Sequence, residues 1–258
     1  MSMLNGVDLQ QLDLPFLGPI VEVRRLSHGR TNESTLIRAD GQLWVIRIGS
    51  LKAQQFGINR VHEEQILRCA GAARLAPQIA YCSIEHDVLI TEYLAGVHWQ
   101  PSALHDARNL ERFTRLIQRV HDLPVDLPIT DYFQHAENYW RRLVEMNCAV
   151  PDNIATMRDR VLEQQQSSPS LAARVTLCHR DITPANVIDY DGQLYLLDWE
   201  YAARGDPAFD YAAISNEWGL AIEVLLNSAR TSRPALESAD LLYRYTCALW
   251  ELLDSRLD

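Results

Sequence analysis

The sequence has few cysteines and no long apolar run. The five cysteines are odd in number and include no C-x-x-C pair. This argues against a disulfide framework and against a zinc site, and it favours a reducing compartment. No run of about 18 apolar residues occurs, so we expect no transmembrane helix. The first 15 residues lack a basic segment followed by an apolar one, so we expect no secretory signal and predict a cytoplasmic protein.

Positive charge is also scarce. The chain has 24 Lys and Arg against 34 Asp and Glu, a formal net charge of −10. Nucleic acids and anionic membrane surfaces both require basic patches, so we expect neither as a partner. A cationic small molecule is compatible with this charge. The sequence does not indicate an oligomeric state.

The first part of the chain has strand and hairpin patterns. Asp40-Gly41 is a strong signal for a two-residue hairpin, and Glu85-His86-Asp87 separates a second pair of apolar runs. One helix is expected between these hairpins, with Asn59 as a plausible N-cap. The expected strands are residues 20–26, 34–38 and 43–49, and the expected helix is 59–72.

From Ala95 onward the pattern changes to helices. Apolar residues recur with helical spacing over 106–122 and 131–147, in the second case through Phe133, Ala136, Trp140, Leu143 and Val144. A weaker helical pattern covers 152–166. With 258 residues and 47% hydrophobic residues, the chain can form two lobes, each with a core. We predict an α+β fold, with a β-rich N-lobe at 1–94 that holds one main helix and a larger, mainly helical C-lobe at 95–258.

The stretch CHRDITPANVIDYDGQLYLLDWEYA interrupts the helical half. Asp191-Gly192 predicts a tight hairpin, which would place Asn186 beside Asp198 at its open end. The preceding loop would deliver Asp181 to the same end. Two carboxylates and an amide oxygen suit Mg²⁺, which takes few protein ligands and completes its shell with phosphate and water. Asp181 would then be left to accept a proton from a hydroxyl nucleophile.

These segments resemble a known family. HRDITPAN followed by LDWE looks like the H-x-D-x-x-x-x-N motif and the metal-binding Asp of the kinase-like small-molecule phosphotransferases, the group of choline/ethanolamine kinases, thiamine kinase and aminoglycoside phosphotransferases. TNESTLIR, INRVHEEQ and ITEYLAG look like the nucleotide-loop hairpin, the start of the αC helix and the hinge, and LDWEYAARGDPAFDYA is particularly similar to choline/ethanolamine and thiamine kinases. The resemblance implies a bilobal protein-kinase-like fold and ATP-dependent phosphorylation of a hydroxyl on a small molecule.

The resemblance also implies roles for the central residues. Asp181 would be the catalytic base, while Asn186 and Asp198 would hold Mg²⁺. We expect His179 to order its loop by hydrogen bonding. We expect Asp210 to be a buried structural acid that ties this loop down, with a direct substrate role as the alternative.

On the nucleotide side, Arg47 continues the apolar face of its strand and needs a partner, because an unpaired buried charge is costly. Glu63 lies on the apolar stripe of the expected helix and Glu64 does not, so we expect Glu63 to pair with Arg47 and Glu64 to be solvated. By resemblance, Arg47 would contact the ATP phosphates. SHGRTN has a single glycine, but Thr31 and Asn32 match the residues that close the family's nucleotide loop. Glu92 and Tyr93, in the hinge segment, would present backbone groups to adenine.

The acceptor is predicted to be small. A helix-like stretch begins near Pro207, so no protein-kinase activation segment fits after Asp198. Aromatic faces and acids suit a cationic alcohol. The nearest candidates are Trp199, Tyr201, Tyr211 and Trp218 with the acids Glu200 and Glu217, and Tyr139 and Trp140 are alternatives from the helical lobe. A choline/ethanolamine-kinase-like activity is the first expectation, thiamine kinase the second and an aminoglycoside or sugar kinase the third. A non-catalytic kinase-like binding module is the alternative of a different class.

Overall fold

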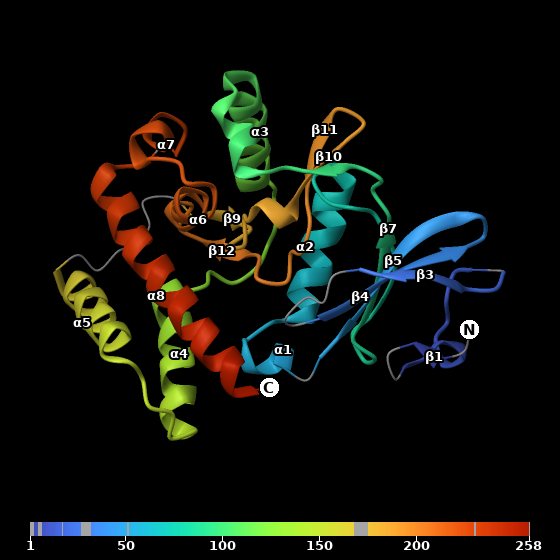
Figure 1. Cartoon of the computed structure of the whole chain (residues 1–258), viewed down its shortest axis with the longest axis horizontal. Helices are drawn as coiled ribbons and strands as arrows, with labels where there is room; N and C mark the ends of the chain where they lie inside the picture. Colours follow the sequence, from blue (N-terminus) through green and yellow to red (C-terminus); the bar gives the residue numbers. More distant parts are fainter. Residues whose placement is uncertain are drawn as a thin grey trace. The chain divides into compact units, whose positions relative to one another are not determined.

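The computed structural model describes residues 3–4, 7–16, 18–26, 32–50, 52–167, 175–229 and 231–257. The chain divides into two compact units (Figure 1). Unit 1 comprises Met1–Val97 and Ile188–Glu200, and unit 2 comprises His98–Val187 and Tyr201–Asp258.

Unit 1 is built on a five-stranded antiparallel sheet with the strand order β3-β4-β5-β7-β6. Its strands are β3 (Val21–Arg25), β4 (Asn32–Ala39), β5 (Gln42–Gly49), β6 (Ile79–Ser83) and β7 (Val88–Glu92). The Asp40-Gly41 turn joins β4 to β5 with positive φ at both residues, the geometry that this dipeptide favours. One face of the sheet packs into a core with Leu9 and Leu12, which belong to a short segment with β1 (Met3–Leu4), β2 (Val7–Asp8) and η1 (Leu9–Gln11).

The main helix of unit 1 is α2 (Arg60–Ala72), which follows the single turn α1 (Lys52–Gln55). Asn59 caps α2, since its side chain accepts hydrogen bonds from the backbone N–H groups of Val61 and His62. Glu63, Ile66, Leu67 and Ala70 are buried along one stripe. The predicted helix, its cap and its inner face are therefore confirmed.

The hairpin β10 (Val187–Tyr190) and β11 (Gln193–Leu196) turns at Asp191-Gly192, as predicted, and β8 (Val97–His98) is its third strand. Its residues 188–197 pack on unit 1, because Ile188 and Tyr195 form a buried cluster with Leu94. The backbone N–H of Leu196 also donates to the carbonyl of Leu75 at 2.8 Å. The hairpin therefore groups with unit 1. The predicted lobes, residues 1–94 and 95–258, had assigned it to the C-lobe, and these two ranges stay a prediction as domain limits.

Unit 2 is mainly helical. The long helix α8 contacts α4, α5 and α6 (Figure 1), and a buried aromatic cluster lies among α4, α6 and α8. Its helices are α3 (Ala107–His121), α4 (Tyr132–Glu145), α5 (Asp152–Ser167), α6 (Ala208–Trp218), α7 (Ile222–Ala229) and α8 (Arg233–Leu257), with short η2 (Pro101–His105), η3 (Pro184–Asn186) and the strand pair β9 (Thr176–Cys178) and β12 (Ala203–Gly205). The predicted α+β composition is confirmed.

The buried face of α4 differs from the predicted stripe. Tyr132, Ala136, Tyr139 and Leu143 are buried, whereas Val144 is 53% exposed. Trp140 is half-buried and carries the guanidinium of Arg158 from α5 at 4.4 Å from its ring centroid. Tyr132 and Tyr139 thus occupy the interior positions that the predicted apolar stripe assigned to Trp140 and Val144.

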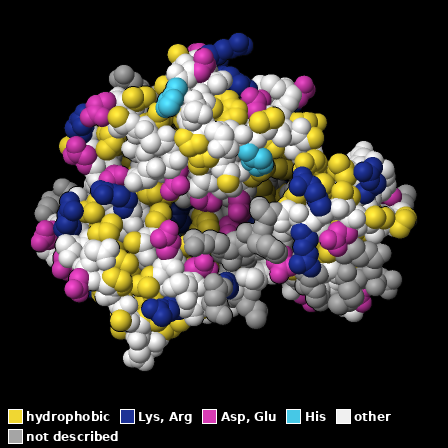
Figure 2. Space-filling model, in the orientation of Figure 1, with side chains coloured by type: hydrophobic (Ala, Val, Ile, Leu, Met, Phe, Trp, Pro, Cys, Tyr) yellow, Lys and Arg dark blue, Asp and Glu magenta, His cyan; other side chains and the backbone are white. Residues whose placement is uncertain are grey.

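On the face shown in Figure 2, acidic and basic side chains are interspersed among apolar ones, and neither sign covers a large area. Within the described ranges, no helix combines the length and the apolarity that a membrane span requires.

Candidate functional site

The loop from His179 to Asn186 in unit 2 brings two of the predicted residues together. The Asn186 side chain donates through Nδ2 to Asp181 Oδ2 at 2.7 Å and to the Asp181 carbonyl at 3.0 Å. The backbone N–H of Asp181 donates to His179 Nδ1 at 3.3 Å. His179 is fully buried, so its predicted role in ordering the loop by hydrogen bonding is confirmed.

Asp210, in the first turn of α6, binds the backbone of this loop through its side chain. Its carboxylate is fully buried and accepts the backbone N–H of His179 at 3.0 Å and that of Arg180 at 2.7 Å. His121 Nε2, at the end of α3, lies 2.9 Å from the same carboxylate. Arg180 has a left-handed backbone, with φ 68°, which costs free energy in a residue with a side chain. The two N–H bonds to Asp210 compensate for that strain, and the predicted role of Asp210 as a structural acid is confirmed.

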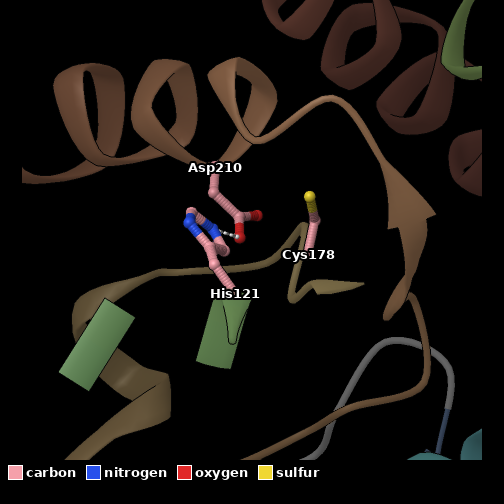
Figure 3. A group of neighbouring side chains, drawn as sticks. All are labelled: His121, Cys178 and Asp210. Carbon is pink, nitrogen blue, oxygen red and sulfur yellow. Dashed lines mark hydrogen bonds and ion pairs between the residues drawn. The ribbon is translucent and has the colours of Figure 1, made fainter. Parts of the chain in front are cut away.

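Figure 3 shows His121, Cys178 and Asp210 side by side, three residue types that can bind a metal ion. Their chemistry argues for a hydrogen-bonded core instead. The carboxylate of Asp210 already accepts the three donors named above. Burial raises the pKa of the Cys178 thiol far above its ordinary value, and its Sγ already lies within hydrogen-bonding distance of the carbonyls of Thr176 and Gly205.

In unit 1, Arg47 on β5 and Glu63 on α2 form a two-pronged ion pair. Arg47 Nη1 lies 2.5 Å from Glu63 Oε1, and Nη2 lies 2.8 Å from Oε2. Burial opposes charge on both groups, but their attraction outweighs it, so the pKa of Arg47 is raised and that of Glu63 is lowered. Glu64 instead pairs with Arg68 on the outer side of the helix. The predicted choice of Glu63 over Glu64 as the partner of Arg47 is confirmed.

A second arginine, Arg60, extends this ion pair into a network that the sequence did not reveal. Arg60 Nη1 lies 2.9 Å from both Glu63 Oε2 and Glu200 Oε2. Asn32, the first residue of β4, donates to Glu200 at 2.7 Å and accepts from Arg60 at 2.7 Å. The signal available in the sequence was that Arg60 precedes Glu63 by three residues, which places both on one side of a helix.

Asp198 lies at the exposed edge of this network. Its side chain is 41% exposed, and its Oδ1 lies 3.8 Å from Arg47 Nη1. Its φ of 59° is left-handed, as is that of Arg180 in the loop of Asp181. Because Asp181 and Asn186 belong to unit 2 and Asp198 to unit 1, their convergence on one metal ion stays a prediction.

The hinge residues are engaged in the sheet. The backbone N–H of Glu92 donates to the carbonyl of Gln78 at 2.9 Å, and that of Tyr93 donates to the carbonyl of Leu43 at 3.3 Å. Adenine recognition by these two residues would therefore use their carbonyl groups. Thr31 lies outside the described residues.

The four predicted substrate residues have different surroundings. Trp199 and Trp218 are buried, and their indole N–H groups donate to the carbonyls of Leu196 and Ile182. Glu200 is buried in the Arg60 network described above. Tyr201 is half-buried, and its hydroxyl accepts a hydrogen bond from Trp250 at 2.8 Å. Of the four, Tyr201 is thus the residue whose position suits contact with a ligand.

Unit 2 also holds a group around Glu217 that the sequence identified only in part. Tyr243 on α8 donates to Glu217 on α6 at 2.9 Å. Burial raises the pKa of the neighbouring Cys247 to about 12, and the negative charges of Glu217 and Asp181 add to the shift. The negative charges of Glu217 and Asp181 therefore both disfavour ionisation of the Cys247 thiol. Tyr243 and Trp250 were missed because they lie 26 residues after Glu217 and 49 residues after Tyr201, on a helix whose pattern reads as core.

Comparison with known proteins places these features in a family. Residues 23–230 match the profile of the choline/ethanolamine kinase family. A LicA homologue of Mycoplasma capricolum is 28% identical over 126 residues, 48% of each chain. LicA of Haemophilus influenzae is 24% identical over 197 residues, which cover 76% of this chain and 58% of the relative. The matched part of the chain thus spans about half the length of these two relatives.

Two solved structures share the fold. The choline kinase LicA from Streptococcus pneumoniae superposes with a TM-score of 0.76 at 20% identity, covering 91% of this chain and 87% of that one. A structure of LicA in complex with AMP has a TM-score of 0.77 at 21% identity, covering 92% and 85%. The predicted protein-kinase-like fold is confirmed. Because the profile match spans most of the 258 residues, the chain belongs to the choline/ethanolamine kinase family.

Proposed function

We propose that this protein is a kinase that uses ATP to phosphorylate the hydroxyl group of a small cationic alcohol, with choline or ethanolamine as the first candidates. The observation that carries the proposal is the contact between Asp181 and Asn186 on a loop that Asp210 fixes from inside unit 2. In the protein-kinase template, an Asp of the catalytic loop accepts the proton of the substrate hydroxyl and an Asn of the same loop holds Mg²⁺. The named activity of the related choline kinase supports it.

Arg47 is the residue proposed to bind the phosphates of ATP. Its guanidinium is held by Glu63 through both terminal nitrogens, and Asp198 Oδ1 lies 3.8 Å from one of them, Nη1. Arg remains charged at all physiological pH values, and each terminal nitrogen that bonds to Glu63 carries a second N–H group that can meet a phosphate oxygen. Asn32 and Glu63 support this position through the network, while Thr31 and the carbonyls of Glu92 and Tyr93 are proposed nucleotide contacts. The AMP bound to the related LicA supports a nucleotide site.

Asn186 and Asp198 are the residues proposed to hold Mg²⁺. Their donor atoms fit a hard cation: Asp198 offers an exposed carboxylate, and the Nδ2 bonds of Asn186 to Asp181 leave its Oδ1 as the ligand atom. When bound, Mg²⁺ neutralises charge on the phosphates of the nucleotide.

Asp181 is proposed to accept the proton of the substrate hydroxyl. The Asn186 N–H at 2.7 Å and the backbone bond to His179 fix the orientation of its carboxylate. The acid is partly exposed, so an alcohol can approach it. General-base assistance typically raises the reaction rate about 10²- to 10⁴-fold, and positioning of the reactants supplies the rest of the rate enhancement.

The acceptor is proposed to bind in unit 2 near Glu217, Tyr201 and Trp250. Glu217 supplies a negative charge beside Tyr243, and Tyr201 and Trp250 supply half-buried aromatic surfaces. Acids and aromatic faces together favour an ammonium group over a neutral sugar.

All five cysteines are free thiols, which fits the predicted cytoplasmic location, where thiols stay reduced.

The test is ATP consumption with Mg²⁺ and a panel of acceptors: choline, ethanolamine, thiamine, an aminoglycoside and a neutral sugar. We expect turnover with choline or ethanolamine and none with the sugar. The Asp198→Asn variant should remain folded and lose nearly all turnover at ordinary Mg²⁺ concentrations. Transfer to thiamine or the aminoglycoside alone would replace the acceptor, and Mg²⁺-dependent nucleotide binding without any transfer would favour a binding module.

A further inference from the structure

Arg60, the first residue of α2, contacts side chains from three other segments of unit 1. Besides Glu63 on its own helix, it contacts Asn32 at the start of β4, Asp87 in the turn before β7 and Glu200 after β11. The side chain is 11% exposed, and its distances to these four partners are 2.7 to 2.9 Å. Three of the four partners are carboxylates, and they come from three different segments, which points to a role beyond helix stability.

One of these contacts reaches the backbone that carries Asp198. Glu200 follows Asp198 by two residues, and its Oε2 accepts from both Arg60 and Asn32. Asp198 has a left-handed backbone, a conformation that persists only where the surroundings impose it. Trp199, whose indole N–H bonds to Leu196, and Glu200 impose it from the C-terminal side.

The same nitrogen of Arg60 also contacts Glu63, the partner of Arg47. Arg60 is thus bonded at once to the acid that orients Arg47 and to the acid that fixes the segment of Asp198. We propose that Arg60 is a positioning residue for phosphoryl transfer, which sets the place of Asp198 relative to Arg47 within unit 1. The proposal deepens the proposed function and rests on it for the roles of these two residues.

The geometry requires arginine in particular. Nη2 donates to Asn32 and Nη1 donates to the two glutamates, while Nε lies 2.7 Å from Asp87 Oδ1 in an ion pair without hydrogen-bond alignment. A lysine carries the charge but is a single point donor, so it cannot serve the same four partners. Gly49 makes room for the last contact, since a Cβ there would lie 1.8 Å from Asp87 Oδ2.

The test compares Arg60→Lys with Arg68→Lys, a matched change on the same helix at the exposed pair with Glu64. Hydrogen–deuterium exchange is measured over residues 197–201 and, as a reference, over residues 36–45 of β4 and β5, which exclude Asn32 and Arg47. The affinity for MgADP is measured by calorimetry. We expect Arg60→Lys to raise exchange at residues 197–201 by about tenfold or more and to weaken MgADP binding by about tenfold, because opening of this segment becomes easier. The reference strands and the KM for the acceptor should stay unchanged, and Arg68→Lys should match the wild type.

Unchanged exchange and unchanged MgADP affinity in Arg60→Lys would overturn the proposal. So would a uniform rise in exchange over the whole sheet, which is the mark of a merely structural residue. If Arg60→Lys does not fold, Asp87→Asn replaces it, and a local rise at residues 197–201 supports the proposal while no rise overturns it. Because exchange and MgADP binding need no turnover, they decide the role of Arg60 even if the wild type transfers phosphate to no alcohol, a result that would refute the proposed function alone.

Discussion

Each of the two units pairs an accessible acid with a buried one. In unit 1, Asp198 is exposed and Glu200 is buried; in unit 2, Asp181 is partly exposed and Asp210 is fully buried. In both places a residue with a left-handed backbone lies beside or at the accessible acid, at Asp198 and at Arg180. The accessible acids are the ones proposed to act on the reaction, and the buried acids fix the chain that presents them.

The units differ in what neutralises the buried acid. Glu200 is held by the cation Arg60 together with the amide of Asn32. Asp210 is held by two backbone N–H groups and a histidine. A site held by ion pairs depends on the balance of nearby charges, whereas a site held by backbone donors depends on one acceptor of the right shape. We therefore expect different substitutions to disturb the two buried acids: changes of nearby charge for Glu200, and changes of the acceptor itself for Asp210.

The largest expected effect tests the division of labour in unit 2. Asp181→Asn should lower kcat by about 10²- to 10⁴-fold, because it removes the proton acceptor. The affinity for MgATP should barely change, since the residues proposed to bind phosphate and metal are intact. Steady-state kinetics and calorimetry together check this. If Asp181 only shapes its loop, MgATP affinity and thermal stability would fall in parallel with the rate.

The next effect concerns the ion pair of unit 1. Glu63→Gln should reduce kcat/KM by about tenfold or more, because a charge-assisted hydrogen bond contributes about 1.5–3 kcal/mol and orients Arg47. Glu64→Gln is the matched control on the outer side of the helix and should change it by less than about twofold. Equal losses in the two variants would show that the Arg47–Glu63 pair does not support the nucleotide site.

A third prediction tests the backbone donors of unit 2. Asp210→Asn should lower the free energy of unfolding by about 2–3 kcal/mol. Asparagine has no charge and only one acceptor oxygen, so one of the backbone N–H groups of His179 and Arg180 would face the NH₂ group of the amide instead of an acceptor. The control is Asp126→Asn, at an exposed position, which should change it by less than about 0.5 kcal/mol. Urea unfolding followed by circular dichroism measures both. Equal stability of the two variants would contradict the support role of Asp210.

The smallest effect is the dependence of the stability of unit 1 on pH. The folded-state pKa of Glu63 is lowered from its ordinary value of 4.5, because Arg47 and Arg60 outweigh the effect of burial. The stabilisation from a lowered pKa is complete above the unfolded-state value and is lost as the pH falls through the folded-state value. The stability difference between wild type and Glu63→Gln should thus be constant above about pH 5 and shrink below pH 4.5. Urea midpoints between pH 7 and pH 3 check this, and a difference that grows at low pH would contradict it.

Local patterns alone determined much of this protein. The Asp-Gly hairpins, the Asn59 cap and the inner face of α2 follow from turn and helix geometry over a few residues, so the sequence predicted them and with them the Arg47–Glu63 pair. The short loop between Asp181 and Asn186 likewise predicted that they come together, and the structure brings them into direct contact. Such contacts depend on backbone geometry that the sequence encodes directly.

Tertiary structure decided the contacts that join distant segments. Asn32 and Glu200 lie 168 positions apart, and no periodicity relates them; folding of β4 and the β11 hairpin into one unit brings them within 2.7 Å. The same holds for Tyr243 and Glu217, and for Trp218, a predicted ligand residue whose indole N–H bonds in the core to Ile182, 36 positions away. Trp199, also a predicted ligand residue, is satisfied locally by Leu196. A buried polar side chain requires a partner, but only the packing of helices and strands determines which residue that partner is.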